Sequence, residues 1–293
     1  MNDRADFDSP ELNSLLPPLT FDRRSFIASM VAGGFALAAQ PVMAQTIIKT
    51  DAEGLDTGVV EIPSDGFNMP AYYARPKSGD KFATVLVIQE IFGVHEHIQD
   101  LCRRLAKKGY LAVAPSLHAR FGDETKISSI AEIMSNIVAK VADEQVMRDL
   151  DNTVAWAAKN KGNTDRLGVT GFCWGGRQTW LYAAHQPKLK AAVAWYGPVN
   201  TPSTPLTPKV VKDVAVDIKV PVLGLYGEAD SGIKVADVEA MRTSLKAAGS
   251  KSEIVIYPGA SHGFNADYRP SYNKEAAEDG WKRLLAWFAA NGV

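Results

Sequence analysis

The amino-acid sequence predicts an α/β protein whose mostly parallel central sheet is covered by helices on both faces. Hydrophobic residues make up 46% of the 293 residues and charged residues 22%, which is the composition of a folded globular protein. Short apolar, β-branched runs alternate with stretches of helical periodicity, as in chains built from strand–helix–strand units. The run at residues 83–89 reads Ala-Thr-Val-Leu-Val-Ile-Gln and is mainly apolar and β-branched, as expected of a strand buried on both faces of a parallel sheet.

Residues 22–44 have the order of an export signal. Arg23 and Arg24 precede a moderately apolar run at residues 26–39, and the small residue Ala44 follows. This order resembles a bacterial twin-arginine (Tat) signal, which implies recognition by the Tat export machinery. The apolar run is shorter than the ~20 residues of a membrane span, so we expect cleavage after Ala44 and a periplasmic protein without a stable membrane anchor. The alternative is an N-terminal helix that happens to carry both arginines.

Residues 1–44 are thus expected to be the signal, and residues 45–293 a single domain. The latter segment matches the roughly 200 to 250 residues that α/β architectures commonly run as one domain. With 32 Lys and Arg against 33 Asp and Glu, the net charge is −1, so no global field favours nucleic acid or anionic lipid as a partner. Cys102 and Cys173 are too few for a disulfide framework, so either would act as a thiol. The sequence leaves the oligomeric state open.

Eight strands are predicted. The first two flank a turn signal at residues 63–66, so we expect them to form an antiparallel edge. The later strands are short apolar runs separated by helices, which favours parallel pairing. The predicted strands are residues 59–62, 70–74, 83–89, 111–114, 167–170, 191–195, 222–226 and 253–257.

Helical periodicity fills the longer segments between these strands. Gly109 is expected to end the first helix, and another helix ends before Pro187. Residues 199–207 are rich in Pro and Thr and are predicted to be a loop. The predicted helices are residues 97–108, one or two helices within 127–160, and residues 175–185, 235–248 and 274–290.

The loop after the fifth predicted strand has the frame of a nucleophile elbow with cysteine in place of serine. It reads Gly-Phe-Cys-Trp-Gly-Gly at residues 171–176 and opens directly into a helix. In such a turn the glycines are needed where a side chain would collide with the neighbouring backbone. The positive end of the helix favours a thiolate at Cys173. The alternative is a buried structural cysteine.

Two further loops complete the pattern of a catalytic triad. Asp230 follows the seventh predicted strand and His262 the eighth. The chain order Cys173, Asp230, His262 is the nucleophile, acid and histidine order of an α/β-hydrolase, at the sheet edge where open α/β sheets bind ligands. Glu228 is an alternative acid, and Asp267 is a weaker one. Taken singly, the histidine also fits a structural loop residue, and the aspartate also fits a helix cap.

Residues 87–94 read Val-Ile-Gln-Glu-Ile-Phe-Gly-Val, at the end of a predicted strand and ahead of the first helix. With the elbow and the triad, this segment resembles the dienelactone hydrolases (carboxymethylenebutenolidases), and the resemblance covers nearly the whole mature chain. It implies that Glu90 contacts the resting cysteine and helps to generate the thiolate when substrate binds. It also implies an oxyanion hole formed by the backbone N–H groups of Ile91 and Trp174. For the glutamate, a helix cap near His95 is the alternative.

The chemistry of a thiolate restricts the substrate. A thiolate attacks an acyl carbon well, but it also leaves the tetrahedral intermediate more readily than an ordinary alkoxide, so simple esters tend to revert. Enol lactones and aryl esters avoid this because their leaving groups are stabilised enolates or phenolates. We therefore expect Cys173 to attack a small-molecule lactone or activated ester, and His262, oriented by Asp230, to activate the water that releases the acyl-thioester.

Substrate recognition departs from the family's pattern. The best-studied members carry an arginine four residues beyond the histidine to bind a substrate carboxylate, whereas this position is Ala266 here and the nearest arginine is Arg269. Arg120 is a candidate replacement, and a solvated surface arginine is the alternative. Aromatic side chains are the other candidates for lining the substrate pocket: Trp174, Trp195, Tyr196 and Phe264. For Trp195, packing in the hydrophobic core is the alternative to a place in the pocket.

No cofactor or metal is expected. His95 and His97 form a His-x-His pair, but two ligands without a third do not make a metal site, and both glycine-rich phosphate-binding frames are absent.

Two other classes of function remain open. One is the same fold acting as a non-catalytic binding protein. The other is a periplasmic thiol redox protein, for which Cys102 would be the resolving cysteine.

Overall fold

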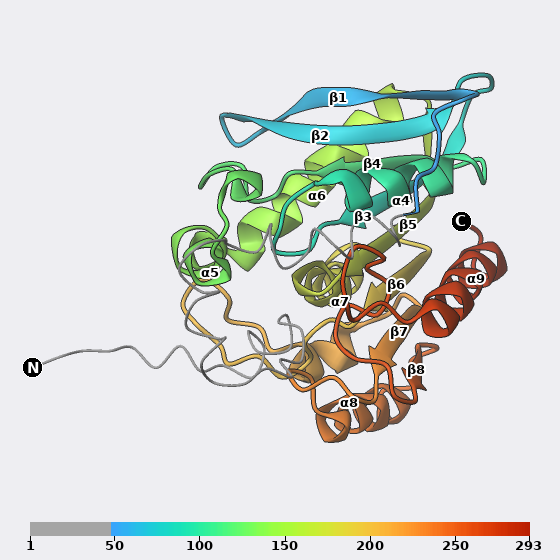
Figure 1. Cartoon of the computed structure of the whole chain (residues 1–293). Coiled ribbons are helices and arrows are strands. Elements are labelled where there is room, and N and C mark those ends of the chain that lie inside the picture. The colour runs from blue at the N-terminus through green and yellow to red at the C-terminus, as the bar shows by residue number, and fades with distance from the viewer. Residues whose placement is uncertain (1–47) are drawn as a thin grey trace, which may run out of the picture.

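The computed structural model describes residues 48–293, which form an eight-stranded sheet surrounded by helices (Figure 1). The strands lie in the order β1-β2-β4-β3-β5-β6-β7-β8. The predicted export signal lies outside the described residues. The strands are β1 (Leu55–Ser64), β2 (Phe67–Pro76), β3 (Phe82–Ile88), β4 (Leu111–Pro115), β5 (Gly162–Phe172), β6 (Ala191–Trp195), β7 (Val222–Gly227) and β8 (Glu253–Tyr257).

The pairing of the strands confirms the predicted fold class. β1 and β2 form an antiparallel pair, β2 joins β4 in the antiparallel sense, and all further neighbours in this sheet are parallel. β1 and β2 are both longer than predicted, because the alternating pattern continues into partly exposed residues at their ends. The interior strands β4, β6 and β7 are buried at every position, as expected for parallel strands covered on both faces.

The helices follow the predicted segments with small shifts at their ends. The segment predicted as one or two helices within 127–160 contains two α-helices separated by a 3-10 turn. No helix of the described residues is both long and apolar enough to cross a membrane. The α-helices are α4 (Glu96–Ala106), α5 (Ile130–Asn136), α6 (Asp143–Lys159), α7 (Trp174–His185), α8 (Val235–Ala247) and α9 (Lys274–Ala290), and the 3-10 helices, which the sequence did not predict, are η1 (Glu124–Lys126), η2 (Val138–Lys140) and η3 (Val211–Asp217).

Helices α7 and α9 lie on opposite faces of the sheet. On β5, Gly168 faces Phe288 of α9, whereas Gly171 faces Thr179 of α7. Residues three apart on a strand point to opposite faces, so the two helices sandwich β5 between them. Helix α6 packs beside α7, and α4 packs on β2, β4 and β3. The carboxyl ends of the parallel strands therefore meet at one edge, where their loops carry the predicted chemistry.

Candidate active site

Cys173 occupies a strained turn between β5 and α7. Its backbone is in the positive-φ region, with φ 56° and ψ −119°, which for a non-glycine residue costs on the order of 1–3 kcal/mol. The turn is crowded: a Cβ on Gly171 would lie 2.3 Å from the carbonyl oxygen of Gly175, and a Cβ on Gly175 would lie 2.4 Å from that of Gln89. The side chain is 7% exposed. The predicted strand–turn–helix geometry and the need for its glycines are confirmed.

Asp230 is the carboxylate that contacts His262. Its Oδ2 atom lies 2.7 Å from Nδ1 of the imidazole. Its Oδ1 atom accepts hydrogen bonds from the backbone N–H groups of Gly232 at 2.9 Å and Ile233 at 3.0 Å, which fix the carboxylate in place. The alternative acid, Glu228, is exposed and accepts a backbone hydrogen bond at the protein surface.

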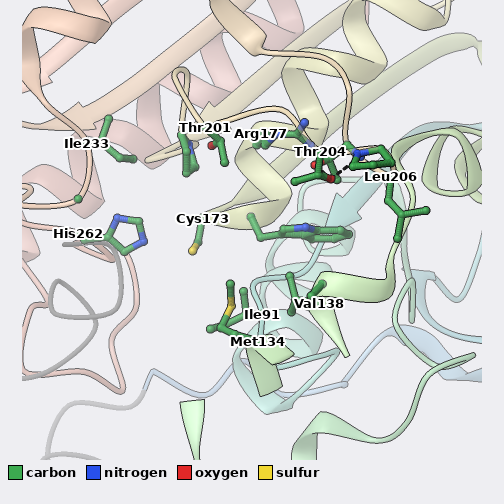
Figure 2. A pocket seen from close by; sticks show the side chains of 16 residues that line it. Ile91, Met134, Val138, Cys173, Arg177, Thr201, Thr204, Leu206, Ile233 and His262 are labelled. Atoms are coloured by element: carbon green, nitrogen blue, oxygen red, sulfur yellow. Dashed lines mark hydrogen bonds between the residues drawn. The ribbon is translucent and has the colours of Figure 1, made fainter. Parts of the chain in front are cut away.

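The other side of the imidazole faces the cysteine. Figure 2 shows the Cys173 sulfur and the His262 ring facing one another at the cavity wall. Burial alone would lower the pKa of His262, but the negative charges of a Cys173 thiolate and of Asp230 outweigh burial and raise this pKa to about 10. The arrangement thus favours a protonated, positively charged His262 at neutral pH.

Three predicted pocket residues lie behind the triad. The ring of Tyr196 meets the edge of His262 with centroids 5.2 Å apart, and Phe264 packs on Tyr196 at 5.3 Å. Trp195 packs on Phe264 and donates from Nε1 to the Thr170 hydroxyl at 3.1 Å. All three aromatic side chains are fully buried, and none of them lines the cavity. These side chains pack in the core next to His262 and do not contact the cavity, so their predicted place in the pocket was wrong. For Trp195, the core-packing alternative is confirmed.

Glu90 lies in the loop directly after β3 and is completely buried. The Tyr268 hydroxyl donates to its Oε2 atom at 2.6 Å, and Arg269 and His95 approach the same oxygen to 3.6 Å and 3.8 Å. Burial by itself would raise the pKa of Glu90, but the positive charge of Arg269, with a smaller contribution from His95, holds it well below its usual range. The carboxylate is therefore ionised and bonded to Tyr268 rather than to Cys173. The helix-cap alternative does not describe this arrangement, and the role of Glu90 in generating the thiolate stays a prediction.

The two histidines of the His-x-His pair have separate carboxylate partners. His97 places Nδ1 3.2 Å from Oδ1 of Asp267, whereas His95 faces Glu90. Arg104 also pairs with Asp267 at 2.8 Å, which engages this weaker alternative acid away from His262. Within residues 48–293, no three His, Cys, Asp or Glu side chains are grouped so that they could hold a metal ion.

Arg120 does not reach the cavity. Its guanidinium forms a two-pronged ion pair with Asp149, with N···O distances of 2.6 and 3.0 Å, and donates to the carbonyl oxygen of Ser64 at 2.6 Å. It also covers the ring of Phe67. The reason is electrostatic: the Asp149 side chain is fully buried and needs a cationic partner. The predicted substrate contact of Arg120 is therefore corrected to a structural ion pair.

A buried polar cluster next to the loop after β3 was not predicted from the sequence. Gln89 Nε2 lies 2.9 Å from Oε1 of Glu124 and 3.0 Å from Nδ1 of His118, which itself lies 3.1 Å from the same carboxylate oxygen. The His118 ring also packs edge-on against Trp174 with centroids 4.4 Å apart. The cluster ties the end of β3 to η1 and to the first residue of α7. Nothing in the spacing of these residues signals that they meet.

The cavity next to Cys173 has a volume of about 520 Å³. Ile91 and Trp174, the predicted oxyanion donors, both line it together with His262.

Cys102, the predicted resolving cysteine of the redox alternative, is fully buried in α4. Burial raises the pKa of its thiol far above the usual range, and Cys102 and Cys173 are both free. An inert thiol of this kind makes a poor resolving cysteine.

Comparison with known proteins places this geometry in a family. A model described as the dienelactone hydrolase family matches residues 69–292. A Methylorubrum extorquens protein provisionally named carboxymethylenebutenolidase is 57% identical, covering 98% of this chain and 99% of its own, and one from Escherichia coli is 54% identical, covering 91% and 98%. The crystal structure of a provisionally named dienelactone hydrolase from Klebsiella pneumoniae is 56% identical with a TM-score of 0.79, covering 80% of this chain and 98% of its own. The chain therefore belongs to the dienelactone hydrolase family and has its α/β-hydrolase fold.

Proposed function

We propose that this protein hydrolyses a lactone or activated ester through a covalent acyl-thioester on Cys173. The observation that carries the proposal is the geometry of three side chains. The Cys173 sulfur projects from a strained elbow toward a histidine whose other nitrogen lies 2.7 Å from a fixed carboxylate. A nucleophile, a base and an orienting acid in this relation are the requirements of acyl transfer.

The first half of the reaction forms the thioester. The Cys173 thiolate attacks the acyl carbon, and the carbonyl electron pair moves to the oxygen, where the N–H groups of Ile91 and Trp174 stabilise the negative charge. Trp174 is the first residue of α7, a position whose N–H has no carbonyl of a preceding turn to bind. Collapse of the intermediate breaks the bond to the leaving oxygen, which takes a proton from the His262 imidazolium.

The second half releases the acid. Neutral His262 accepts a proton from water as the water oxygen attacks the thioester carbon, and the Cys173 thiolate leaves when this second intermediate collapses. The thiolate and the imidazolium are thereby restored, with Asp230 orienting the ring throughout. Because Glu90 is bonded to Tyr268, the thiolate in this proposal is stabilised by His262 and by the N-terminus of α7.

The experiment that tests this proposal measures hydrolysis of a dienelactone and of p-nitrophenyl acetate by the wild-type protein, Cys173→Ala and the matched variant Cys102→Ala under reducing conditions. We expect Cys173→Ala to lose at least about 10³-fold in kcat, because removing the nucleophile of a triad costs that much or more. Cys102→Ala should retain full activity because its thiol lies in the core of α4. An acyl adduct on Cys173, trapped with acid and found by mass spectrometry, is the direct sign of the thioester. Full activity of Cys173→Ala would exclude the mechanism.

We also propose that residues 1–44 direct the protein through the Tat machinery to the periplasm. The support is the order of Arg23, Arg24, the apolar run at residues 26–39 and Ala44. Fractionation of a Tat-competent host, with N-terminal sequencing of the periplasmic product, tests this. We expect a chain that begins at Gln45, and retention in the cytoplasm when both arginines are replaced by lysine.

A further inference from the structure

We infer that the cavity beside Cys173 takes a neutral, apolar acyl or aryl group and discriminates against a substrate that carries a carboxylate. This inference rests on the proposed function, since it concerns the substrate class of the same site. It follows from the charges around the cavity, from its lining and from its size.

The lining of the cavity is mainly apolar. It is contributed by the loops after β3, β5, β6, β7 and β8, by the start of α7, and by the segment of α5 and η2 (Figure 2). A carboxylate moved from water into such surroundings loses its hydration and regains little unless a cation meets it. The principal apolar side chains are Ile91, Met134, Val138, Trp174, Leu206 and Ile233.

Among the described residues that line the cavity, the charged side chains are Arg177 and His262, and both are already paired. Arg177 forms a two-pronged ion pair with the buried Asp143, at 2.5 and 2.9 Å, and donates to the carbonyl oxygen of Lys209 at 2.7 Å. His262 pairs with Asp230. Neither cation is left to balance a second, substrate carboxylate.

The arginines that the sequence offered for a carboxylate are paired in the same way. Arg120 is held by Asp149 outside the cavity. Arg269 is buried next to the ionised Glu90, with its guanidinium over the Phe92 ring, and it does not line the cavity. A carboxylate that approached Arg269 would also meet the charge of Glu90.

Apart from His262, the buried cavity-lining side chain that lacks a hydrogen-bond partner is uncharged, among the residues that the structure describes. The Thr201 hydroxyl is buried and has no hydrogen-bond partner, whereas the hydroxyls of Thr204 and Thr207 bond to each other at 2.8 Å. An unpaired buried hydroxyl favours a ligand with an uncharged oxygen or nitrogen at this position. A volume of about 520 Å³ also lies in the range of drug-sized ligands, so it accommodates several carbon atoms beyond the reacting carbonyl.

A matched pair of esters tests the inference. In p-nitrophenyl hexanoate the acyl chain ends in a methyl group, and in the mono-p-nitrophenyl ester of adipic acid the same chain ends in a carboxylate. We expect kcat/KM to be about 100-fold higher for the hexanoate, since the leaving group is identical and the carboxylate alone must be desolvated. Methyl p-nitrophenyl adipate, which is longer but neutral, controls for length and should be hydrolysed much like the hexanoate.

A gain-of-function variant makes the test independent of lost folding. Leu206 lines the cavity, and 43% of it is exposed, so a longer side chain fits there, and its loop is held by a backbone hydrogen bond from Asp143 N–H to the Leu206 carbonyl. Leu206→Arg should raise kcat/KM for the adipate monoester about fivefold to tenfold relative to the neutral matched variant Leu206→Gln, by the Coulomb attraction of a partly exposed pair.

Binding separates this inference from the proposed function. The affinities of the hexanoate and adipate esters for Cys173→Ala, measured by calorimetry, report discrimination without requiring turnover. Weaker binding of the adipate monoester supports the inference even if neither ester is hydrolysed, an outcome that would reject only the proposed function. Equal or tighter binding of the carboxylate, or equal kcat/KM values, would overturn the inference and leave the cysteine hydrolase intact.

Discussion

Arg120 shows how a residue's partners decide its role. From the sequence, Arg120 is a basic side chain in a loop beside the expected active site, but its partner Asp149 comes from α6, 29 positions later. Sequence spacing carries no information on such a pair. Arg120→Ala should lower the free energy of unfolding by about 3–5 kcal/mol, because it leaves a buried carboxylate without its cation.

The measurement for this variant is urea unfolding together with steady-state kinetics. We expect the folded Arg120→Ala protein to keep the KM of the wild type within about twofold. Arg148→Ala is the matched control, since Arg148 makes only solvent-exposed ion pairs and should cost about 1 kcal/mol or less. A normal unfolding midpoint with a strongly raised KM would return Arg120 to the substrate site.

His262 gives the active site a characteristic dependence on pH. Its pKa of about 10 lies above the value near 6.5 that it has in the unfolded chain. The imidazolium therefore contributes fully to stability below pH 6.5, and this contribution is lost as the pH rises toward 10. Asp230→Asn removes one of the charges that raise the pKa, so stability should fall less between pH 7 and pH 9.5 than in the wild type.

Urea unfolding at pH 6.5, 8 and 9.5 measures this difference, with Asp217→Asn as the control because Asp217 is an exposed carboxylate outside the site. The same Asp230→Asn variant should lose about 10³- to 10⁴-fold in kcat, since the ring is no longer held in the productive tautomer. Parallel pH profiles in the wild type and Asp230→Asn would contradict the assigned pair.

At the scale of elements, the strand ends and their loops were the most predictable part of the site. Cys173, Asp230 and His262 could be found because each follows a clear apolar strand, and parallel strands bring such loops to one edge. The helix η3 was missed because its segment has no sustained helical period. Tyr268 and Glu124 were missed because their roles depend on contacts between distant loops, such as the hydrogen bond from Tyr268 to Glu90 across 178 positions.

The cluster of Gln89, His118 and Glu124 links three of these elements, and its loss should disturb the proposed oxyanion hole. Glu124 in η1 also contacts the loop after β3 closely, because a Cβ on Gly93 would lie 2.7 Å from its Oε1 atom. Glu124→Ala should therefore lower kcat about tenfold, with KM changed less than twofold, because a displaced N–H of Ile91 weakens binding of the oxyanion more than binding of the substrate.

Two variants control this experiment. Glu124→Gln keeps an acceptor and nearly the same volume, so it should recover most of kcat. Glu132→Ala removes an exposed carboxylate from the neighbouring helix α5 and should have no effect on kcat. Equal losses in Glu124→Gln and Glu124→Ala would indicate that charge, rather than position, is what Glu124 supplies.

At the scale of the whole molecule, one sheet carries every part of the site. Glu90 follows β3, Cys173 follows β5, and Asp230 and His262 follow β7 and β8. The triad residues therefore meet only when the parallel strands β5 to β8 are paired as in the folded sheet. A continuous core of buried side chains extends from β1 to α9. We therefore expect residues 48–293 to unfold as one cooperative unit.

Two probes at different places in the sheet test that expectation. Cys102 is fully buried in α4, against β2, β4 and β3, and its thiol reacts with a thiol reagent only when this region opens. Tryptophan fluorescence reports mainly on the other half, where Trp180 and Trp195 are fully buried. In Cys173→Ala, whose single thiol is Cys102, the urea midpoints for labelling and for fluorescence should agree within about 0.2 M, as two-state unfolding requires. If Cys102 is labelled at a lower urea concentration than the one at which the fluorescence changes, the sheet unfolds as two separate units. The active-site loop after β3 would then open independently of the triad.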